Sequence, residues 1–265
     1  MLGAIIGDII GSRFEFNNTN RTDFDLFTGE SSYTDDTICT VAIADAILNG
    51  KSYKDSLLEW CRRYPNPKGS YGGSFVRWIH SADPQPYNSY GNGSAMRVSP
   101  IGWAFDNYQD VLNQAKRSAE VSHNHPEGIK GSQCIADLIY HLRTGKIGKD
   151  AVKRCVKHSF GYEILPVKRI RETNSFNETC QVTVPQAISC FLEGEDFEET
   201  IRLAISIGGD SDTIGAIAGS IAEAYYKIPD NITVEALSKL PDDMFTVLNS
   251  FINRYPEYGD KLLKL

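Results

Sequence analysis

Apolar residues recur at helical spacing along most of this chain, and this periodicity restricts the fold more than any other feature. In residues 36–48, for example, Ile38, Val41 and Ala42 follow the i, i+3, i+4 pattern of a buried helix face. Alternating runs of β-branched residues, which indicate strands, are nearly absent. We therefore expect an all-α fold. No shift in composition marks a boundary, which favours a single compact multi-helix domain over residues 1–265.

Further segments share the helical period and are expected to be helices: 53–63, 74–80, 110–121, 127–143, 149–157, 181–193, 197–206, 213–226, 233–239 and 243–253. Thr34 or Asp35 can cap the helix at 36–48, and Asn49-Gly50 can close it. Two stretches, 63–73 and 82–94, combine Pro, Gly, Asn and Ser and are expected to be loops. Loops of this length in a compact domain are often functional.

Glycines recur every fourth residue at two places, at Gly3, Gly7 and Gly11 and again at Gly215 and Gly219. At this spacing they line one face of a helix, where the missing side chain lets another backbone approach closely. The pattern predicts two helices buried in the core.

Charge and cysteine usage exclude several classes of protein. With 27 Lys and Arg against 34 Asp and Glu, the net charge is −7, so we expect neither extended nucleic-acid binding nor attraction to anionic membranes. The apolar N-terminus lacks a basic start and contains Asp8, unlike a signal peptide or a spanning helix. The 6 cysteines form no C-x-x-C pair, which favours a reducing, cytoplasmic location.

Two acidic clusters lie far apart in the sequence, at 34–37 and 208–213, and each precedes an apolar helix. Either cluster alone is explained equally well by N-capping, since helix N-termini favour carboxylates. Together they place two carboxylates and two hydroxyls at each helix start, which is the all-oxygen ligand set that Mg²⁺ or Mn²⁺ prefers. If the fold brings them together, two ions about 3.5–4 Å apart are the expected arrangement.

The loop GNGSAMR could hold a phosphate, because Gly91 and Gly93 allow backbone N–H groups to approach it. Taken alone, a plain turn explains this sequence at least as well. Arg97 could pair with a phosphate or with a partner inside the protein. His123 and His125 lack the further ligands of a zinc site. Aromatic residues of the two loops could stack on adenine or pack in the core: Tyr71, Phe75, Tyr87 and Tyr90.

The ordered motifs GDIIGSRFEF, YTDDT, GNGSAMR, SHNHPEG and GGDSDTIGAIAGSIAEAYY resemble those of the ADP-ribosyl-glycohydrolase family. This family includes dinitrogenase reductase-activating glycohydrolase and the ADP-ribosyl-arginine and ADP-ribosyl-serine hydrolases. The resemblance extends from Gly3 to about Tyr226. It implies an all-α domain with a metal site at helix N-termini.

The resemblance also implies residue roles. The ligands of two Mg²⁺ ions, or of Mn²⁺, are expected to be Thr34, Asp35, Asp36, Asp210, Asp212 and Thr213. Glu15, Asp35, Asp36 and Asp210 are expected to take part in catalysis. The substrate-binding residues are expected to be Gly91, Asn92, Gly93, Ser94, Ala95, Met96 and His123.

The activity expected from the resemblance is hydrolysis of the N- or O-glycosidic bond between ADP-ribose and a modified side chain or small acceptor. Two alternatives stay open at the level of sequence. A two-metal phosphodiesterase or pyrophosphatase would instead release AMP, and a non-catalytic protein would only bind ADP-ribose. The sequence leaves open the linkage, the target, the general base and the oligomeric state, for which a monomer is favoured.

Overall fold

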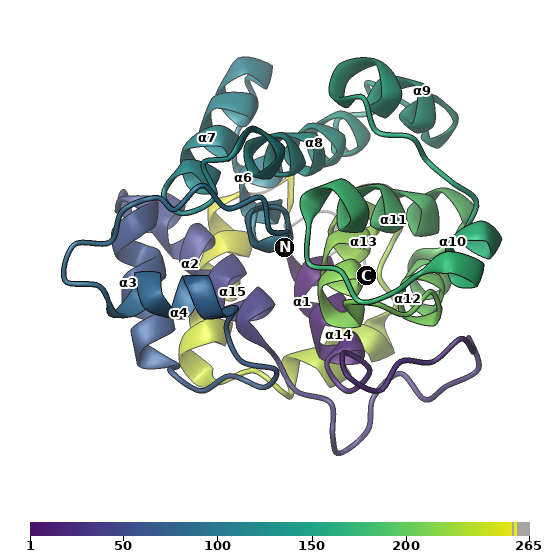
Figure 1. The fold of residues 1–265 in the computed structure, drawn as a ribbon, viewed down its shortest axis with the longest axis horizontal. Coiled ribbons are helices and arrows are strands. Elements are labelled where there is room, and N and C mark those ends of the chain that lie inside the picture. Colours follow the sequence, from purple (N-terminus) through teal and green to yellow (C-terminus); the bar gives the residue numbers. More distant parts are fainter. Residues whose placement is uncertain (256, 259–265) are drawn as a thin grey trace.

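The computed structural model describes residues 1–255, 257 and 258, and within these residues it forms helices and no strand (Figure 1). In chain order the helices are α1 Leu2–Gly11, α2 Asp35–Asn49, α3 Tyr53–Arg63, α4 Gly73–His80, α5 Gly93–Met96, α6 Ser99–Ala104, α7 Tyr108–Glu120, α8 Pro126–Arg143, α9 Lys149–Phe160, α10 Val167–Thr173, α11 Cys180–Glu193, α12 Phe197–Ser206, α13 Ser211–Tyr225, α14 Asp230–Leu237 and α15 Asp242–Arg254. The predicted all-α fold is confirmed.

The helices predicted from periodicity all form, with modest shifts at their ends. The largest shifts are three residues: α14 begins at Asp230 after Pro229 instead of at residue 233, and α9 ends at Phe160 instead of at residue 157. The sequence does not reveal α5, α6 and α10, because helices of one or two turns show no apolar period. Thr34 caps α2 by accepting a hydrogen bond from the Asp36 N–H, and Gly50 closes this helix with a φ of 63°. Both ends match the expectation.

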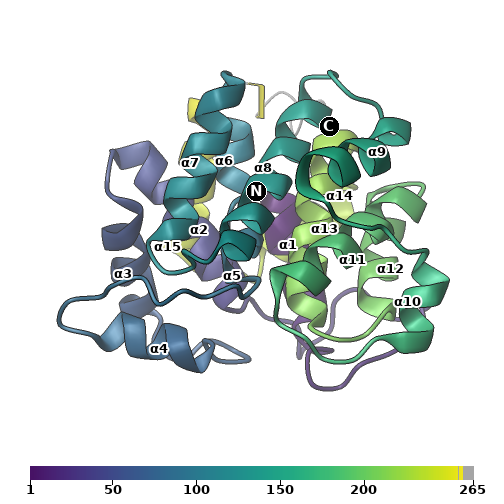
Figure 2. The same ribbon diagram turned by 45° about the horizontal axis from the view of Figure 1, so that its top comes forward.

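Helices α1 and α13 form the centre of the molecule, where Figures 1 and 2 both show them side by side. Every residue of α1 is buried. A Cβ added at Gly7 would lie 2.0 Å from the carbonyl oxygen of Gly215, and one at Gly3 would lie 2.3 Å from that of Gly219. The two glycine series therefore face each other and let the helix backbones touch. The spacing predicts two buried helices open to close approach; that they pair with each other is a finding of the structure.

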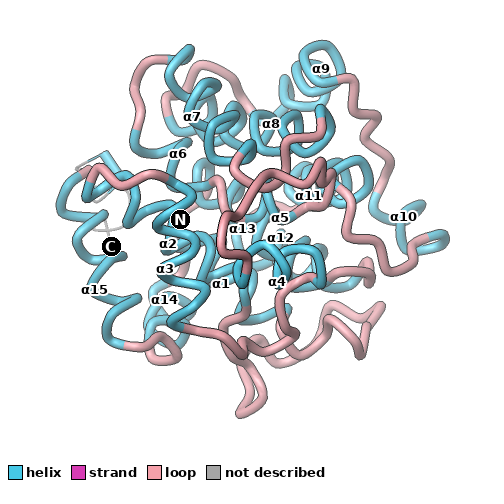
Figure 3. The backbone as a smooth tube through the Cα atoms, turned by 60° about the vertical axis from the view of Figure 1, so that its left-hand side comes forward, coloured by secondary structure: helices cyan, strands magenta, loops and turns pink. Residues whose placement is uncertain are grey.

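This close packing brings together segments that carry polar residues. The end of α1 packs against the start of α13, because a Cβ at Gly11 would lie 2.5 Å from the Cα of Asp212. Figure 3 shows loops gathered around α4, α5 and α13. None of the helices in the described part of the chain is long and apolar enough to cross a membrane.

Candidate active site

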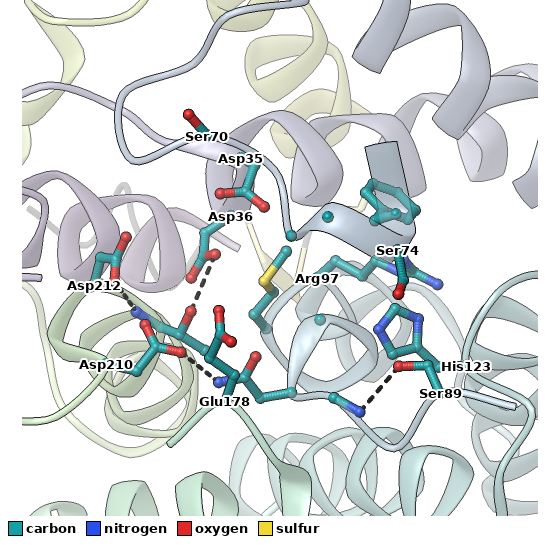
Figure 4. A pocket seen from close by; sticks show the side chains of 18 of the residues that line it. Asp35, Asp36, Ser70, Ser74, Ser89, Arg97, His123, Glu178, Asp210 and Asp212 are labelled. Atoms are coloured by element: carbon teal, nitrogen blue, oxygen red, sulfur yellow. Dashed lines mark hydrogen bonds between the residues drawn. The ribbon is translucent and has the colours of Figure 1, made fainter. Parts of the chain in front are cut away.

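A pocket opens where the N-termini of α2 and α13 meet the loops that precede α4 and α5 (Figure 4). Most of the residues predicted to form the site line it: Glu15, Asp35, Asp36, Gly91, Asn92, Gly93, Met96, His123, Asp210, Asp212 and Thr213. The remaining predicted residues, Thr34, Ser94 and Ala95, are buried. The fold thus gathers both acidic clusters and the glycine loop into one cavity.

The N-terminus of α2 carries the first acidic cluster. Thr34 is its N-cap, so Asp35 and Asp36 occupy the first turn. Asp36 is buried, and its Oδ2 atom has no hydrogen-bond partner among the described residues. Asp35 lines the same pocket and is half-buried. The first cluster therefore presents carboxylate oxygens that the protein itself leaves unsatisfied.

The N-terminus of α13 carries the second cluster. Asp210 occupies the N-cap position, and its Oδ2 accepts a hydrogen bond of 2.7 Å from the Asn92 side chain. Gly208 and Gly209 precede it with φ of 68° and 81°, a backbone conformation that favours glycine. Thr213 Oγ1 lies 3.3 Å from Asp36 Oδ1, so the two clusters are in direct contact.

Glu15 lies in the segment that follows α1 and joins the second cluster. One carboxylate oxygen each from Glu15, Asp210 and Asp212 lies within 4.8 Å of the other two. Glu15 Oε2 is buried and lacks a hydrogen-bond partner in the described part of the chain. A Cβ at Gly69 would lie 2.4 Å from this oxygen, so the glycine allows the loop before α4 to close over Glu15.

The carboxylates share a strongly unfavourable environment. Burial, and then the neighbouring charge of Asp210, raises the pKa of Glu15 to about 7. Burial raises the pKa of Asp36 well above its ordinary value, and the charge of Asp8 adds to the effect. The pKa of Asp212 is likewise raised well above its ordinary value by burial and by Asp210.

A cation in this pocket would relieve the repulsion. Among the described residues that line the pocket, Arg97 carries the sole positive side chain, and its Nη2 is used by the Ser118 carbonyl and the Ser122 hydroxyl. The unsatisfied oxygens of Asp36 and Glu15, in an all-oxygen donor set, fit a hard divalent ion such as Mg²⁺ or Mn²⁺.

The glycine loop forms the opposite wall of the pocket. A Cβ at Gly93 would lie 3.0 Å from His123 Nε2, so only glycine leaves this space open. The Ser94 hydroxyl donates to the Gly128 carbonyl at 2.7 Å and supports the loop from behind. Gly91, Gly93 and Asn92 are thus exposed to the pocket, while Ser94 holds their backbone in place.

His123 is buried and neutral. Its Nδ1 pairs with the Ser122 hydroxyl at 2.8 Å, and burial, followed by the nearby Arg97 charge, lowers its pKa well below the ordinary value. Of the aromatic residues considered from the sequence, Phe75 and Tyr87 line the pocket with His123. Tyr90 instead lines an adjoining groove. Tyr71 is buried and donates to the Tyr64 carbonyl.

Several polar residues in or near the pocket were not predicted as site residues, among them Ser74, which lines the pocket from α4. Ser70, Ser89 and Glu178 line the pocket from loops with no periodic pattern. Asp8 is buried in α1 and binds Thr34 and Thr37. Asp8 carried a signal, since a lone carboxylate inside an apolar helix must find partners. Ser70 and Ser89 lie in the two loops whose length suggests a function, but nothing singled them out within these loops, and Glu178 lies outside both.

Comparisons with known proteins agree with this geometry. The sequence profile of the family described as ADP-ribosylglycohydrolase matches residues 1–261. ADP-ribosylhydrolase ARH3 of Homo sapiens is 26% identical over 304 residues, covering 85% of this chain and 84% of the human protein. ADP-ribosyl-[dinitrogen reductase] glycohydrolase of Rhodospirillum rubrum is 25% identical over 264 residues, covering 90% and 88%. A solved structure titled ADP-ribosylglycohydrolase-related protein complex superposes with a TM-score of 0.70 at 25% identity, covering 96% and 97%.

Proposed function

Because this chain belongs to the ADP-ribosylglycohydrolase family, we propose that its acidic pocket binds two divalent cations and uses them to release ADP-ribose from a modified side chain or small acceptor. The family assignment makes the protein an enzyme that hydrolyses ADP-ribose linkages. The observation that carries the proposal is the meeting of two acidic helix N-termini, which contact each other through Thr213 and Asp36.

The residues that would hold the ions come from both clusters and from the segment after α1: Thr34, Asp35, Asp36, Asp210, Asp212, Thr213 and Glu15. When bound, two Mg²⁺ or Mn²⁺ ions would neutralise these carboxylates and supply Lewis acidity to the oxygen atoms of the ribose and of water. The unsatisfied Oδ2 of Asp36 and Oε2 of Glu15, considered within the described residues, support this assignment.

Glycoside cleavage passes through an oxocarbenium-like transition state, in which positive charge develops on the anomeric carbon of the ribose. In the proposed complex this carbon would lie next to the acidic clusters. Nearby carboxylates stabilise that charge. Glu15 is a candidate proton acceptor for water, since its Oε2 has no hydrogen-bond partner in the described part of the chain and its carboxylate lies beside Asp210 and Asp212. Asp35, Asp36 and Asp210 are the further candidates for catalysis.

The rest of the substrate would lie along the glycine loop. The diphosphate would lie against Gly91 and Gly93, where the missing side chains leave space beside His123. The N–H groups of Gly91 and Asn92 already donate to Ser89 Oγ and to the Glu178 carbonyl. Phe75 and Tyr87 provide flat apolar surfaces for the adenine, and neutral His123 can donate or accept a hydrogen bond. Arg97 also lines the pocket; its Nη2 donates to Ser118 and Ser122, whereas its Nε has no hydrogen-bond partner among the described residues.

We further propose that residues 1–265 form one domain that acts as a cytoplasmic monomer. Helices from both ends of the described chain pack together, since α15 contacts α2 and α14 contacts α1. All six cysteines lie within the described residues and are free thiols, which suits a reducing compartment. Sedimentation of the purified protein tests the oligomeric state.

Product analysis tests the proposed activity. The protein is incubated with ADP-ribosyl-arginine and ADP-ribosyl-serine peptides, with Mg²⁺ or with a chelator. The Asp210→Ala, Asp212→Ala double variant and the surface variant Asp83→Ala serve as test and control. We expect Mg²⁺-dependent release of intact ADP-ribose, lost in the double variant alone, and the preferred peptide identifies the linkage. Release of AMP would establish a phosphodiesterase, and binding without any product would establish an ADP-ribose-binding protein.

A further inference from the structure

Asp8 forms an unusually complete set of hydrogen bonds with the start of α2. This carboxylate is fully buried in α1. Its Oδ1 accepts from Thr34 Oγ1 at 2.7 Å, and its Oδ2 accepts from the Thr34 N–H at 2.9 Å and the Thr37 N–H at 3.1 Å. Thr37 Oγ1 also donates to Oδ2. Asp8 therefore holds two backbone and two hydroxyl donors at the helix start that carries the first acidic cluster.

The direction of the Thr34 hydrogen bond has a chemical consequence. An ionised carboxylate can only accept, so the hydroxyl proton of Thr34 is committed to Asp8. Both lone pairs of Thr34 Oγ1 then remain as acceptors. One accepts the Asp36 N–H at 3.2 Å, and no donor in the described part of the chain uses the second.

The same turn of α1 also fixes the second cluster. Asp8 and Gly11 are three residues apart, which is less than one helical turn of about 3.6 residues. A Cβ at Gly11 would lie 2.6 Å from the Ser211 carbonyl and 2.5 Å from the Asp212 Cα. Both halves of the acidic site are therefore positioned against one short segment of α1, the first through Asp8 and the second through Gly11.

We propose that Asp8 is a positioning residue: it orients the Thr34 hydroxyl as a cation acceptor and keeps the start of α2 in register with the start of α13. This inference rests on the proposed two-cation site. We do not assign Asp8 as a ligand, because its Oδ2 already accepts three hydrogen bonds and its Oδ1 accepts one, all from Thr34 and Thr37.

The Asp8→Asn variant distinguishes the orientation of the Thr34 hydroxyl from the packing of α1 against α2. Two backbone N–H groups face Oδ2, so the amide oxygen must occupy that position and the NH₂ group must face Thr34 Oγ1. The Thr34 hydroxyl then has to accept a hydrogen bond, which removes the lone pair available to a cation. The matched control is Thr37→Val, which also removes one hydrogen bond to Asp8 but leaves Thr34 unchanged.

Manganese binding provides the readout, by calorimetric titration and by the magnetic coupling of two Mn²⁺ ions in electron paramagnetic resonance spectra. We expect both variants to lose a similar amount of thermal stability. Asp8→Asn should weaken Mn²⁺ binding at least tenfold and abolish the coupled signal, whereas Thr37→Val should stay within about threefold of wild type. Equal Mn²⁺ affinity in the two variants overturns the orienting role of Asp8.

A second pair of variants changes Thr34, the hydrogen-bond partner of Asp8, and leaves α1 unaltered. It tests whether the Thr34 hydroxyl takes part in cation binding. Thr34→Ser keeps the hydroxyl and should bind Mn²⁺ like wild type, whereas Thr34→Val should bind at least tenfold more weakly. Equal binding by the Ser and Val variants overturns the inference while the two-cation site stands. Failure of the wild-type protein to bind Mn²⁺ at all overturns the proposed site and this inference together.

Discussion

Thr213 Oγ1 donates a hydrogen bond to Asp36 Oδ1 at 3.3 Å, although the two residues are 177 positions apart in the chain. Each lies in the first turn of its helix, α13 for Thr213 and α2 for Asp36. This contact converts two N-capping sequences into one acidic site. N-capping alone does not require the two helix N-termini to be in contact, because each cap satisfies the backbone N–H groups of its own helix.

Replacing Asp36 by Asn should abolish most activity while sparing the fold. The variant removes one charge and one oxygen ligand, so kcat/KM should fall by at least about 100-fold at saturating Mg²⁺. Without metal, the melting temperature should rise, because burial and neighbouring carboxylates disfavour the Asp36 charge. Activity assays and calorimetry check both effects, with Asp83→Asn as the exposed control. Unchanged activity would remove Asp36 from the site.

Adding a methyl group at Gly7 should separate α1 from α13. The new Cβ would lie 2.0 Å from the Gly215 carbonyl oxygen, and both helices are buried, so neither backbone can shift freely. We expect Gly7→Ala to reduce the free energy of unfolding by about 1–3 kcal/mol or more, as overpacking does. Gly29→Ala is the control, since no described atom lies within 4 Å of its added Cβ. Chemical denaturation measures both, and equal stabilities would contradict the packing.

The metal-free protein should become less stable, relative to Glu15→Gln, as the pH rises. The pKa of Glu15 is raised in the fold from 4.5 to about 7, chiefly by burial and then by Asp210. The folded state therefore binds more protons than the unfolded state in this window, and stability decreases with increasing pH. The difference between the two proteins should grow from about pH 4.5 to about pH 7 and then level off.

Chemical denaturation of the wild type and of Glu15→Gln at each pH, in the presence of a chelator, measures this difference in the free energy of unfolding. Saturating Mg²⁺ should reverse its sign, because the cation compensates the Glu15 charge. A constant difference across the window would show that Glu15 is not held in a repulsive environment.

His123 should stay neutral throughout the physiological range. Burial and the charge of Arg97 lower its pKa well below the ordinary value, whereas a hydrogen bond to Asp137 raises the pKa of His141. In ¹⁵N-detected imidazole spectra, His141 should become protonated at a higher pH than an ordinary histidine, whereas His123 should show no protonation in the physiological range. Titration of His123 in this range would mean that it can offer a positive charge to the diphosphate.

The fold could be predicted from the sequence wherever helices are long enough to show a period. The glycine series at Gly3 and Gly215 also indicated two buried helices, because the spacing is a local property of each helix, but it did not indicate that these helices pack against each other. By contrast, α5 at Gly93–Met96 is a single turn stabilised by contacts such as Ser94 with Gly128, which no local pattern reveals.

The acidic site was predictable because its carboxylates cluster in the sequence. Residues that act from outside the clusters were not. Asp8 gives no sign of its partners Thr34 and Thr37 until the fold brings α1 beside α2. Ser70 and Glu178 belong to irregular loops whose course depends on tertiary contacts.

The most direct test of the two-cation site is anomalous X-ray diffraction from crystals soaked in Mn²⁺, with data collected at the manganese edge. We predict two peaks about 3.5–4 Å apart, between the carboxylates of Asp36 and Asp212. Each should lie about 2.0–2.2 Å from carboxylate oxygens, and both should be lost in the Asp210→Ala, Asp212→Ala variant. The absence of peaks there, in crystals soaked at a concentration that supports full activity, would contradict the account.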